Sequence, residues 1–177
     1  QEFPDVVVGA GTVLKPADGL KALGAGARFL ASPVMNPEMI QFGVENNVLV
    51  LPGVSTPTEM VNALAAGAQI PAGLLGGSGG GAEFIKTIAG PLPNLPMIAT
   101  GGIDEEELCD YWNAGVWTVG LGTKLIPTKA LAERNEEKMV KRIKKLLAIR
   151  DGYLNPEDCD TPHPSPPPQG GRGETHE

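Results

Sequence analysis

Short, continuously apolar runs recur along the chain and alternate with longer segments that show helical periodicity. Continuous runs of this length are typical of strands buried on both faces of a sheet, whereas half-exposed strands alternate apolar and polar residues. The predicted strands are residues 6–9, 29–32, 48–51, 97–100 and 117–120. A repeated series of strand and helix predicts a parallel sheet in an α/β fold.

Helix start and stop signals separate these runs. Asn36-Pro37 and Thr56-Pro57 each place a capping residue before a proline, and Glu59 completes a capping box with Thr56. Asp104 precedes an acidic first turn, which suits the helix dipole. Four predicted helix ends carry a glycine after an alanine, where a left-handed cap is favoured. These glycines are Gly26, Gly67, Gly90 and Gly115.

Two architectures are compatible with this series: an open, doubly wound sheet and a closed barrel. Polar or glycine-rich residues follow nearly every predicted strand. A barrel assembles its active site from all these strand ends, whereas an open sheet concentrates its site at one switch point. We therefore predict a (β/α)8 barrel of the TIM type. Because a complete barrel typically needs about 250 residues, the 177 residues of this chain predict an incomplete one.

One unit departs from the repeat. The helix stop at Gly67 runs into Ala68–Ile70 and then meets Pro71 at once. Because proline cannot continue a central strand, this strand is predicted to be short by about four residues. Residues 73–81 are rich in glycine and predict a loop before a helix that begins at Ala82. Such a loop could present amides to a phosphate, or it could be flexible surface.

The last part of the chain differs from the repeats. Residues 130–149 predict one charged amphipathic helix. Residues 154–177 are rich in proline and glycine and predict a disordered tail, with a proline-motif ligand as a minor alternative. The predicted domains are therefore a partial barrel over residues 1–153 and a tail over residues 154–177.

Composition and charge narrow the function classes. The formal net charge of −7 argues against a nucleic-acid surface. The two cysteines are too few for a disulfide framework, and the chain has no apolar stretch of about 18 residues that would predict a membrane span. With no basic-then-apolar leader at its start, a cytoplasmic protein is expected. His163 and His176 both lie in the tail, which excludes a Ser-His-Asp triad or a histidine-ligated zinc in the barrel. No metal and no cofactor are expected.

The first strand end superficially matches a dinucleotide-binding fingerprint. Gly9 and Gly11 have its spacing, but Leu14 stands where the third glycine belongs, and no acidic residue follows about 20 residues on. Nicotinamide binding is therefore disfavoured. Thr12 could instead offer its hydroxyl and amide to a carboxylate at the barrel mouth. Pro52, at the next strand end, is a further candidate for substrate contact, although it could simply turn the chain.

The last two strand ends carry the clearest local signal. Thr100-Gly101-Gly102 and Gly122-Thr123 are consecutive glycine-rich ends, at the position where barrels commonly bind phosphate. Their backbone amides and the two threonine hydroxyls predict an anion site.

In this order, the strand-end motifs resemble the 2-keto-3-deoxy-6-phosphogluconate (KDPG) aldolase family, which includes the 4-hydroxy-2-oxoglutarate (KHG) aldolases. The resemblance covers roughly residues 3–153 and is interrupted at the shortened strand. The matching segments are residues 8–13, 31–33, 51–57, 71–72, 88–93 and 100–103.

The resemblance implies a class I aldolase that cleaves KDPG to pyruvate and glyceraldehyde 3-phosphate, or KHG to pyruvate and glyoxylate. In this family a lysine forms a Schiff base with pyruvate and a glutamate moves protons. By resemblance, Thr12 would contact the pyruvate carboxylate, and Thr100 would contact the substrate and influence its stereochemistry. Gly101, Gly102, Gly122 and Thr123 would line the phosphate end. A cytoplasmic homo-oligomer, a trimer by analogy, is also implied.

Two departures from the family predict that the chain is inactive as written. The Schiff-base lysine of the family stands on the strand before Pro71-Ala72, which is the shortened strand here. The glutamate and a carboxylate-binding arginine lie on the first two βα units, which this chain lacks. No catalytic residue is therefore assigned, and neither Lys86 nor Lys124 is expected to substitute. The alternatives are a non-catalytic phosphosugar- or carboxylate-binding barrel fragment and a truncated or mis-assembled reading frame.

Overall fold

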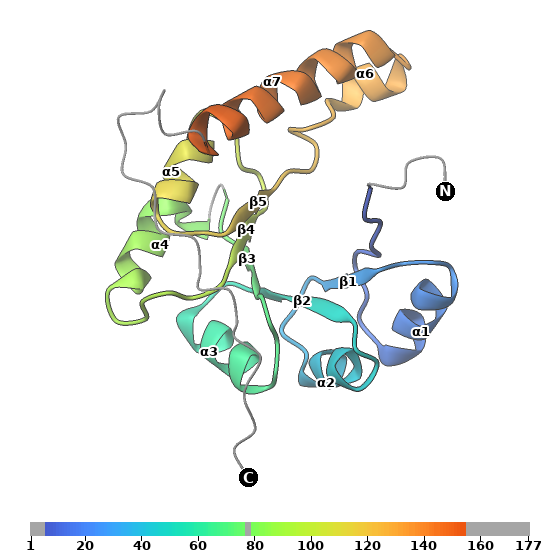
Figure 1. The fold of residues 1–177 in the computed structure, drawn as a ribbon, viewed down its shortest axis with the longest axis vertical. Helices are drawn as coiled ribbons and strands as arrows, with labels where there is room; N and C mark the ends of the chain where they lie inside the picture. The colour runs from blue at the N-terminus through green and yellow to red at the C-terminus, as the bar shows by residue number, and fades with distance from the viewer. Residues whose placement is uncertain (1–5, 77–78, 155–177) are drawn as a thin grey trace.

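A computed structural model describes residues 6–76 and 79–154 as a parallel sheet with helices packed against it (Figure 1). The strands are β1 (Phe29–Ser32), β2 (Leu49–Val54), β3 (Ala72–Leu74), β4 (Ile98–Thr100) and β5 (Thr118–Gly120). The helices are α1 (Pro16–Gly24), α2 (Pro37–Glu45), α3 (Pro57–Ala65), α4 (Gly81–Ala89), η2 (Glu105–Glu107), α5 (Leu108–Asn113), α6 (Thr128–Ala132) and α7 (Glu136–Leu154).

The strand order follows the sequence, β1-β2-β3-β4-β5, and every neighbouring pair is parallel. A helix follows each of the first three strands and leads to the next, which is the repeat of a TIM-barrel-type fold. Within the described residues the order is linear, with no pairing of β1 to β5. Within these residues the sheet is therefore open, with β1 and β5 as its first and last strands.

Alternate strand residues pack under the helices. Leu30 and Val50 are buried with Met39 of α2, while Ala99 of β4 is buried with Tyr111 of α5. The residues between them, such as Leu51, Ala72 and Thr100, are half-buried on the inner face. The helix-covered face thus forms the hydrophobic core, and the inner face leads to the strand ends.

The prediction of a strand at residues 6–9 is wrong in detail. This segment has no strand structure, and a single parallel bridge joins Ala10 to Leu30. Arg28 N–H donates to Val8 O over 2.8 Å and Ala31 N–H donates to Ala10 O over 2.8 Å. The segment thus runs along the edge of β1, but one bridge does not make a ladder.

The strand that is predicted to be short begins later in the sequence than expected. The strand does not end at Ile70; β3 begins after Pro71 and uses Gly73 and Leu74, which the sequence assigns to a loop. Pro71 contributes its carbonyl, which accepts from Ile98 N–H at 3.1 Å. Because a proline is tolerated at the start of a strand, the chain can complete the sheet with the residues that follow it.

Most predicted helix boundaries are confirmed. The Asn36 side chain accepts from Glu38 N–H, and Thr56 and Glu59 form the capping box. Gly26, Gly67 and Gly115 have φ of 98°, 100° and 99°. Gly90 is the exception, with φ of −58°. There the chain continues the helical turn, since Leu92 N–H donates to Ile88 O at 3.0 Å.

The single helix predicted over residues 130–149 is two helices, α6 and α7. Arg134 has φ of 51° between them, and Asn135 accepts from Lys138 N–H at 2.9 Å, which caps α7. An asparagine is a strong N-cap, so it starts a new helix rather than continuing the old one. The helix α7 ends at Leu154, and the rest of the predicted tail lies outside the described residues. Among the described helices, none has the length and apolar character needed to cross a membrane.

Candidate functional site

The carboxyl ends of parallel strands share one edge of the sheet, so the loops after β4 and β5 lie beside each other. The register pairs Thr100 of β4 with Gly120 of β5, the last residue of each strand. The candidate residues Gly101 and Gly102 follow the first strand, and Gly122-Thr123 follows the second. The structure therefore brings together the residues for which the sequence predicts an anion site.

Thr100 joins these two strand ends. Its half-buried hydroxyl donates to Gly120 O over 3.2 Å. A Cβ at position 120 would lie 2.9 Å from Thr100 Oγ1, so a side chain there would crowd the hydroxyl. Because a hydroxyl has one proton to donate, Thr100 can accept a further hydrogen bond here but cannot also donate one to an anion.

Gly101 and Gly102 turn the chain sharply after β4. Their φ angles are 93° and 77°, a region that residues with a Cβ rarely adopt. Both residues are exposed. Backbone N–H groups in such turns can form a concave anion-binding surface, so the exposed backbone, rather than the Thr100 hydroxyl, is the candidate donor.

Gly122 and Thr123 are exposed on the loop after β5. The Gly122 carbonyl accepts from Leu125 N–H at 2.9 Å and from Ile126 N–H at 3.3 Å. Lys124 Nζ lies 2.7 Å from Asp104 Oδ1. The Lys124 ammonium therefore forms an ion pair with the Asp104 carboxylate.

Thr12 and Pro52 stand apart from this cluster. Thr12 is exposed, has φ of 58°, and lies beside β1, at the far end of the strand order from β5. Pro52 is buried within β2, opposite Ser32 of β1. Their roles in substrate contact stay predictions.

Leu74 is a residue that the sequence does not single out. It is 41% exposed at the end of β3 and pairs with Thr100 of β4. Leu74 reaches this position because β3 begins late, at Ala72. The sequence signal for the late start is the number of residues between Gly67 and Pro71. None of the residues in β1–β5 is ionisable. The strands thus offer hydroxyls and backbone groups but no amine.

Charged residues lie just beyond the two loops. Lys145 donates to Glu105 Oε1 at 2.9 Å, and Arg142 donates to Glu105 Oε2. These two cations, with Lys145 as the larger influence, hold the pKa of Glu105 below its usual value.

Tyr111 of α5 is buried, and its hydroxyl donates to Leu75 O over 3.2 Å. Burial, with a smaller effect of Glu107, raises the pKa of this phenol.

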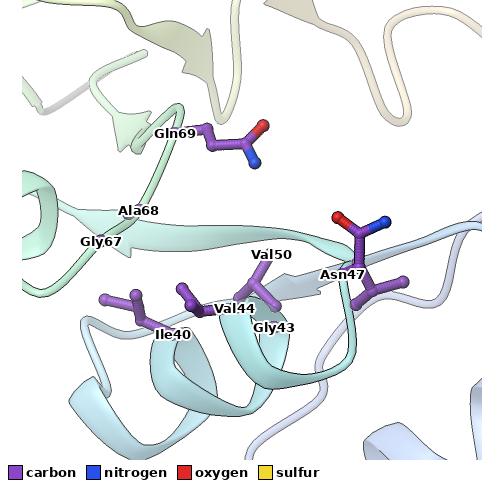
Figure 2. A pocket seen from close by; sticks show the side chains of 9 residues that line it. Ile40, Gly43, Val44, Asn47, Val50, Gly67, Ala68 and Gln69 are labelled. Atoms are coloured by element: carbon purple, nitrogen blue, oxygen red, sulfur yellow. The ribbon is translucent and has the colours of Figure 1, made fainter. Parts of the chain in front are cut away.

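Two cavities lie away from these loops. One, of about 380 Å³, is lined by residues that precede β2 and β3, including Asn47, Val48 and Gln69, and by Ile40 and Val44 of α2 (Figure 2). It is therefore at the amino-terminal side of the strands. The other, of about 290 Å³, adjoins the start of α4 and the side of α5. No group of three or more metal-ligating side chains occurs within the described residues.

The chain is similar in sequence to known aldolases. Residues 1–143 match the family model described as "Aldolase: KDPG and KHG aldolase". A "Probable 2-dehydro-3-deoxy-6-phosphogalactonate aldolase" of Rhizobium meliloti (strain 1021) is 38% identical over 124 residues, which are 67% of this chain and 56% of that protein. A "2-dehydro-3-deoxy-phosphogluconate aldolase" of Pseudomonas aeruginosa is 34% identical over 148 residues, 81% of this chain and 64% of that protein.

Solved structures agree with the sequence relatives. A structure described as "Native KDPGal structure" superposes with a TM-score of 0.75 and 29% identity, over 86% of this chain and 73% of that one. The KDPG aldolase of Legionella pneumophila, "with pyruvate captured at low pH as a covalent carbinolamine intermediate", has a TM-score of 0.75 and 29% identity, over 82% and 70%. The chain thus spans between 56% and 64% of the first two curated relatives.

Proposed function

Because the chain belongs to the KDPG and KHG aldolase family, we propose that it binds a phosphorylated 2-keto acid of the kind that its relatives cleave. The proposed site is the pair of loops after β4 and β5. The relatives are named for phosphorylated 2-dehydro-3-deoxy sugar acids, which carry a carboxylate at one end and a phosphate at the other. The phosphate is assigned to Gly101-Gly102 and Gly122-Thr123.

One observation carries this proposal. The two glycine-rich loops lie at adjacent strand ends, and the hydroxyl of Thr100 joins these strands. Barrels commonly bind phosphate at the loops after their last strands, with backbone amides as donors. Exposed glycines leave this backbone open to a ligand.

We propose further that the chain, as written, binds such a ligand without cleaving it. Class I cleavage requires an amine that attacks the keto carbon, and the strands β1–β5 carry no lysine. Lys124 forms an ion pair with Asp104, and Lys86 Nζ lies 3.7 Å from Glu83 Oε2 on α4. Cleavage by the family, and the pyruvate adduct of the Legionella relative, would therefore not extend to this polypeptide.

Calorimetry tests the binding half of the proposal. Titration of the chain with KDPG should give saturable heat, and Thr123→Val should weaken binding because it removes a hydroxyl from the phosphate end. The exposed Thr87→Val on α4 is the matched control and should bind like the original chain. A flat titration of the original chain would remove this function.

Borohydride trapping tests the chemical half. Incubation with pyruvate and borohydride should leave the mass of the chain unchanged apart from slow, non-specific labelling of surface lysines. A stoichiometric pyruvyl adduct on one lysine would contradict the proposal and would make the chain an active Schiff-base former. We also propose that the protein acts in the cytoplasm as a homo-oligomer, as expected for this family.

A further inference from the structure

A ring of charged side chains connects the two loops of the proposed site to α7. Asp104 belongs to the loop after β4, and both of its oxygens lie near Lys124 Nζ, at 2.7 and 2.9 Å. Lys124 belongs to the loop after β5, and its carbonyl accepts from Arg142 Nε of α7 at 3.1 Å. Arg142 in turn donates to Glu105, the neighbour of Asp104. Asp104, Lys124, Arg142 and Glu105 are called the charge ring below.

The charge ring is closed, which distinguishes it from isolated surface ion pairs. An isolated exposed pair stabilises a fold little, whereas several charges joined in a network of good geometry stabilise it more. The Glu105 and Arg142 side chains are only 15% and 22% exposed, so solvent screens their pairing less than that of the other pairs. Lys145 adds a second cation to Glu105 at 2.9 Å. Each of the three segments is thus bonded to the other two.

The ring brackets the glycine-rich loops. At the strand side, Thr100 Oγ1 donates to Gly120 O. At the far side, Asp104 pairs with Lys124. Residues 101–103 and 121–123 lie between these two connections, and Ile103 is anchored in the core with 1% exposure. Two glycine-containing turns are therefore held at both ends.

We propose that the charge ring consists of positioning residues, which fix the loops after β4 and β5 in one arrangement and so raise their affinity for a phosphate group. This inference rests on the proposed function of the loops. The ring residues need not touch the ligand. Their effect is to reduce the ordering cost of binding, because a site that is already rigid loses less conformational freedom when the anion binds.

The direction in which Asp104→Asn changes the affinity for phosphate distinguishes a positioning role from a purely electrostatic one. The substitution removes a negative charge near an anion site, so electrostatics alone predicts tighter binding. Loss of the Lys124 pair loosens the loops, so positioning predicts weaker binding. Calorimetric titration with inorganic phosphate should therefore show a dissociation constant that rises about two- to thirtyfold. Asp104→Glu keeps a carboxylate within reach of Lys124 and should restore most of the affinity.

A matched control separates local from general effects. Asp18 pairs with Lys21 at 3.1 Å on α1, at the other end of the sheet, so Asp18→Asn removes the same charge from an exposed pair. It should bind phosphate like the original chain. Glu105→Gln is the second diagnostic variant and should weaken binding in the same direction as Asp104→Asn. Circular dichroism confirms that each variant is folded.

Hydrogen exchange provides a readout that does not depend on a ligand. Amides of residues 101–104 and 121–125 should exchange faster in Asp104→Asn than in the original chain, while those of α3 stay unchanged. Phosphate binding that is equal or tighter in Asp104→Asn would overturn the positioning role and leave the binding function intact. Absence of phosphate binding by the original chain would overturn both proposals.

Discussion

At the residue scale, the Thr100 hydroxyl has a structural use that its sequence context does not reveal. The motif Thr100-Gly101-Gly102 predicts a hydroxyl directed at an anion, yet its proton is donated to Gly120 O. The hydroxyl joins β4 to β5 in addition to the ladder between them. Its oxygen remains an acceptor, so a ligand that donates a hydroxyl proton is a better partner for Thr100 than a bare anion is.

Thr100→Val should lower the free energy of unfolding by about 1 kcal/mol, because it removes one partly buried hydrogen bond while keeping the shape of the side chain. Thr100→Ser should retain most of this stability, since serine carries the same donor. Urea unfolding followed by circular dichroism measures both. Equal stability of the valine variant and the original chain would mean that the hydroxyl contributes nothing to the fold.

Glu59 makes stability depend on pH. Hydrogen bonds from Ser55 N–H and the Thr56 side chain lower the pKa of Glu59 from its usual 4.5. A lowered folded-state pKa stabilises the fold above the usual value, and this contribution is lost as the pH falls through the lowered pKa. The stability difference between the original chain and Glu59→Gln should therefore be present at pH 7 and vanish in acid, as measured by urea midpoints.

Thr56→Ala provides the companion measurement for this cap. It removes the side-chain acceptor of Glu59 N–H, at 3.3 Å, and should cost about 1 kcal/mol at pH 7. A difference between Glu59→Gln and the original chain that stays constant from pH 7 into acid would contradict the pH argument for Glu59.

At the scale of single elements, β3 shows what the sequence can and cannot predict. Capping residues and glycine stops predict α2, α3 and the start of β1 because their signals are local. The position of β3 depends on β2 and β4, whose unpaired edges require a strand whether or not its residues favour one. Sheet pairing therefore assigns Gly73 and Leu74 to β3, although their local composition predicts a loop.

The sequence likewise predicts some residues of the candidate site and misses others. The sequence predicts Gly101, Gly102, Gly122 and Thr123 because strand ends and glycine turns are local patterns. It does not predict the charge ring, since Lys124 and Arg142 lie 18 positions apart in the sequence. Only the packing of α7 against the loops brings them together. Leu74 is missed for a similar reason, because its place follows from the register with Thr100.

Leu74→Lys tests the chemistry that β3 lacks. The substitution would put an amine at the end of β3 beside Thr100, so pyruvate bound at the strand ends would lie next to a nucleophile. Borohydride should then trap more pyruvyl adduct on this variant than on the original chain, as measured by mass spectrometry. Leu131→Lys adds the same amine on exposed α6 and is the control. Equal labelling of the two variants would contradict the placement of β3 at the site.

At the scale of the whole molecule, the linear strand order leaves apolar surface on both sides of the sheet. Val6, Val7 and Val8 are more than half exposed along the edge of β1, and Leu74 and Trp117 are also exposed. Unpaired sheet edges and exposed apolar residues favour association between chains. These features support the proposal of a homo-oligomer.

Light scattering coupled to size-exclusion chromatography should therefore give a mass above that of one chain, and the mass of three chains if the family analogy holds. Val7→Lys places a charge in the exposed segment and should shift the distribution toward monomer. Leu20→Lys on α1 is the control, since Leu20 is similarly exposed. A monomeric mass for the original chain at micromolar concentration would contradict this prediction.

The late start of β3 has a consequence for the lengths that this segment can tolerate. β1 and β5 begin three residues after their helix-stop glycines, Gly26 and Gly115, whereas β3 begins five residues after Gly67. The difference of two is even, and side chains alternate faces with a period of two. The alternation is therefore conserved: Gly73 and Leu30 are each the second residue of their strand, and both are buried. We expect natural length variants between Gly67 and β3 to differ by even numbers of residues, because an odd change would exchange the inside of the wall with its outside.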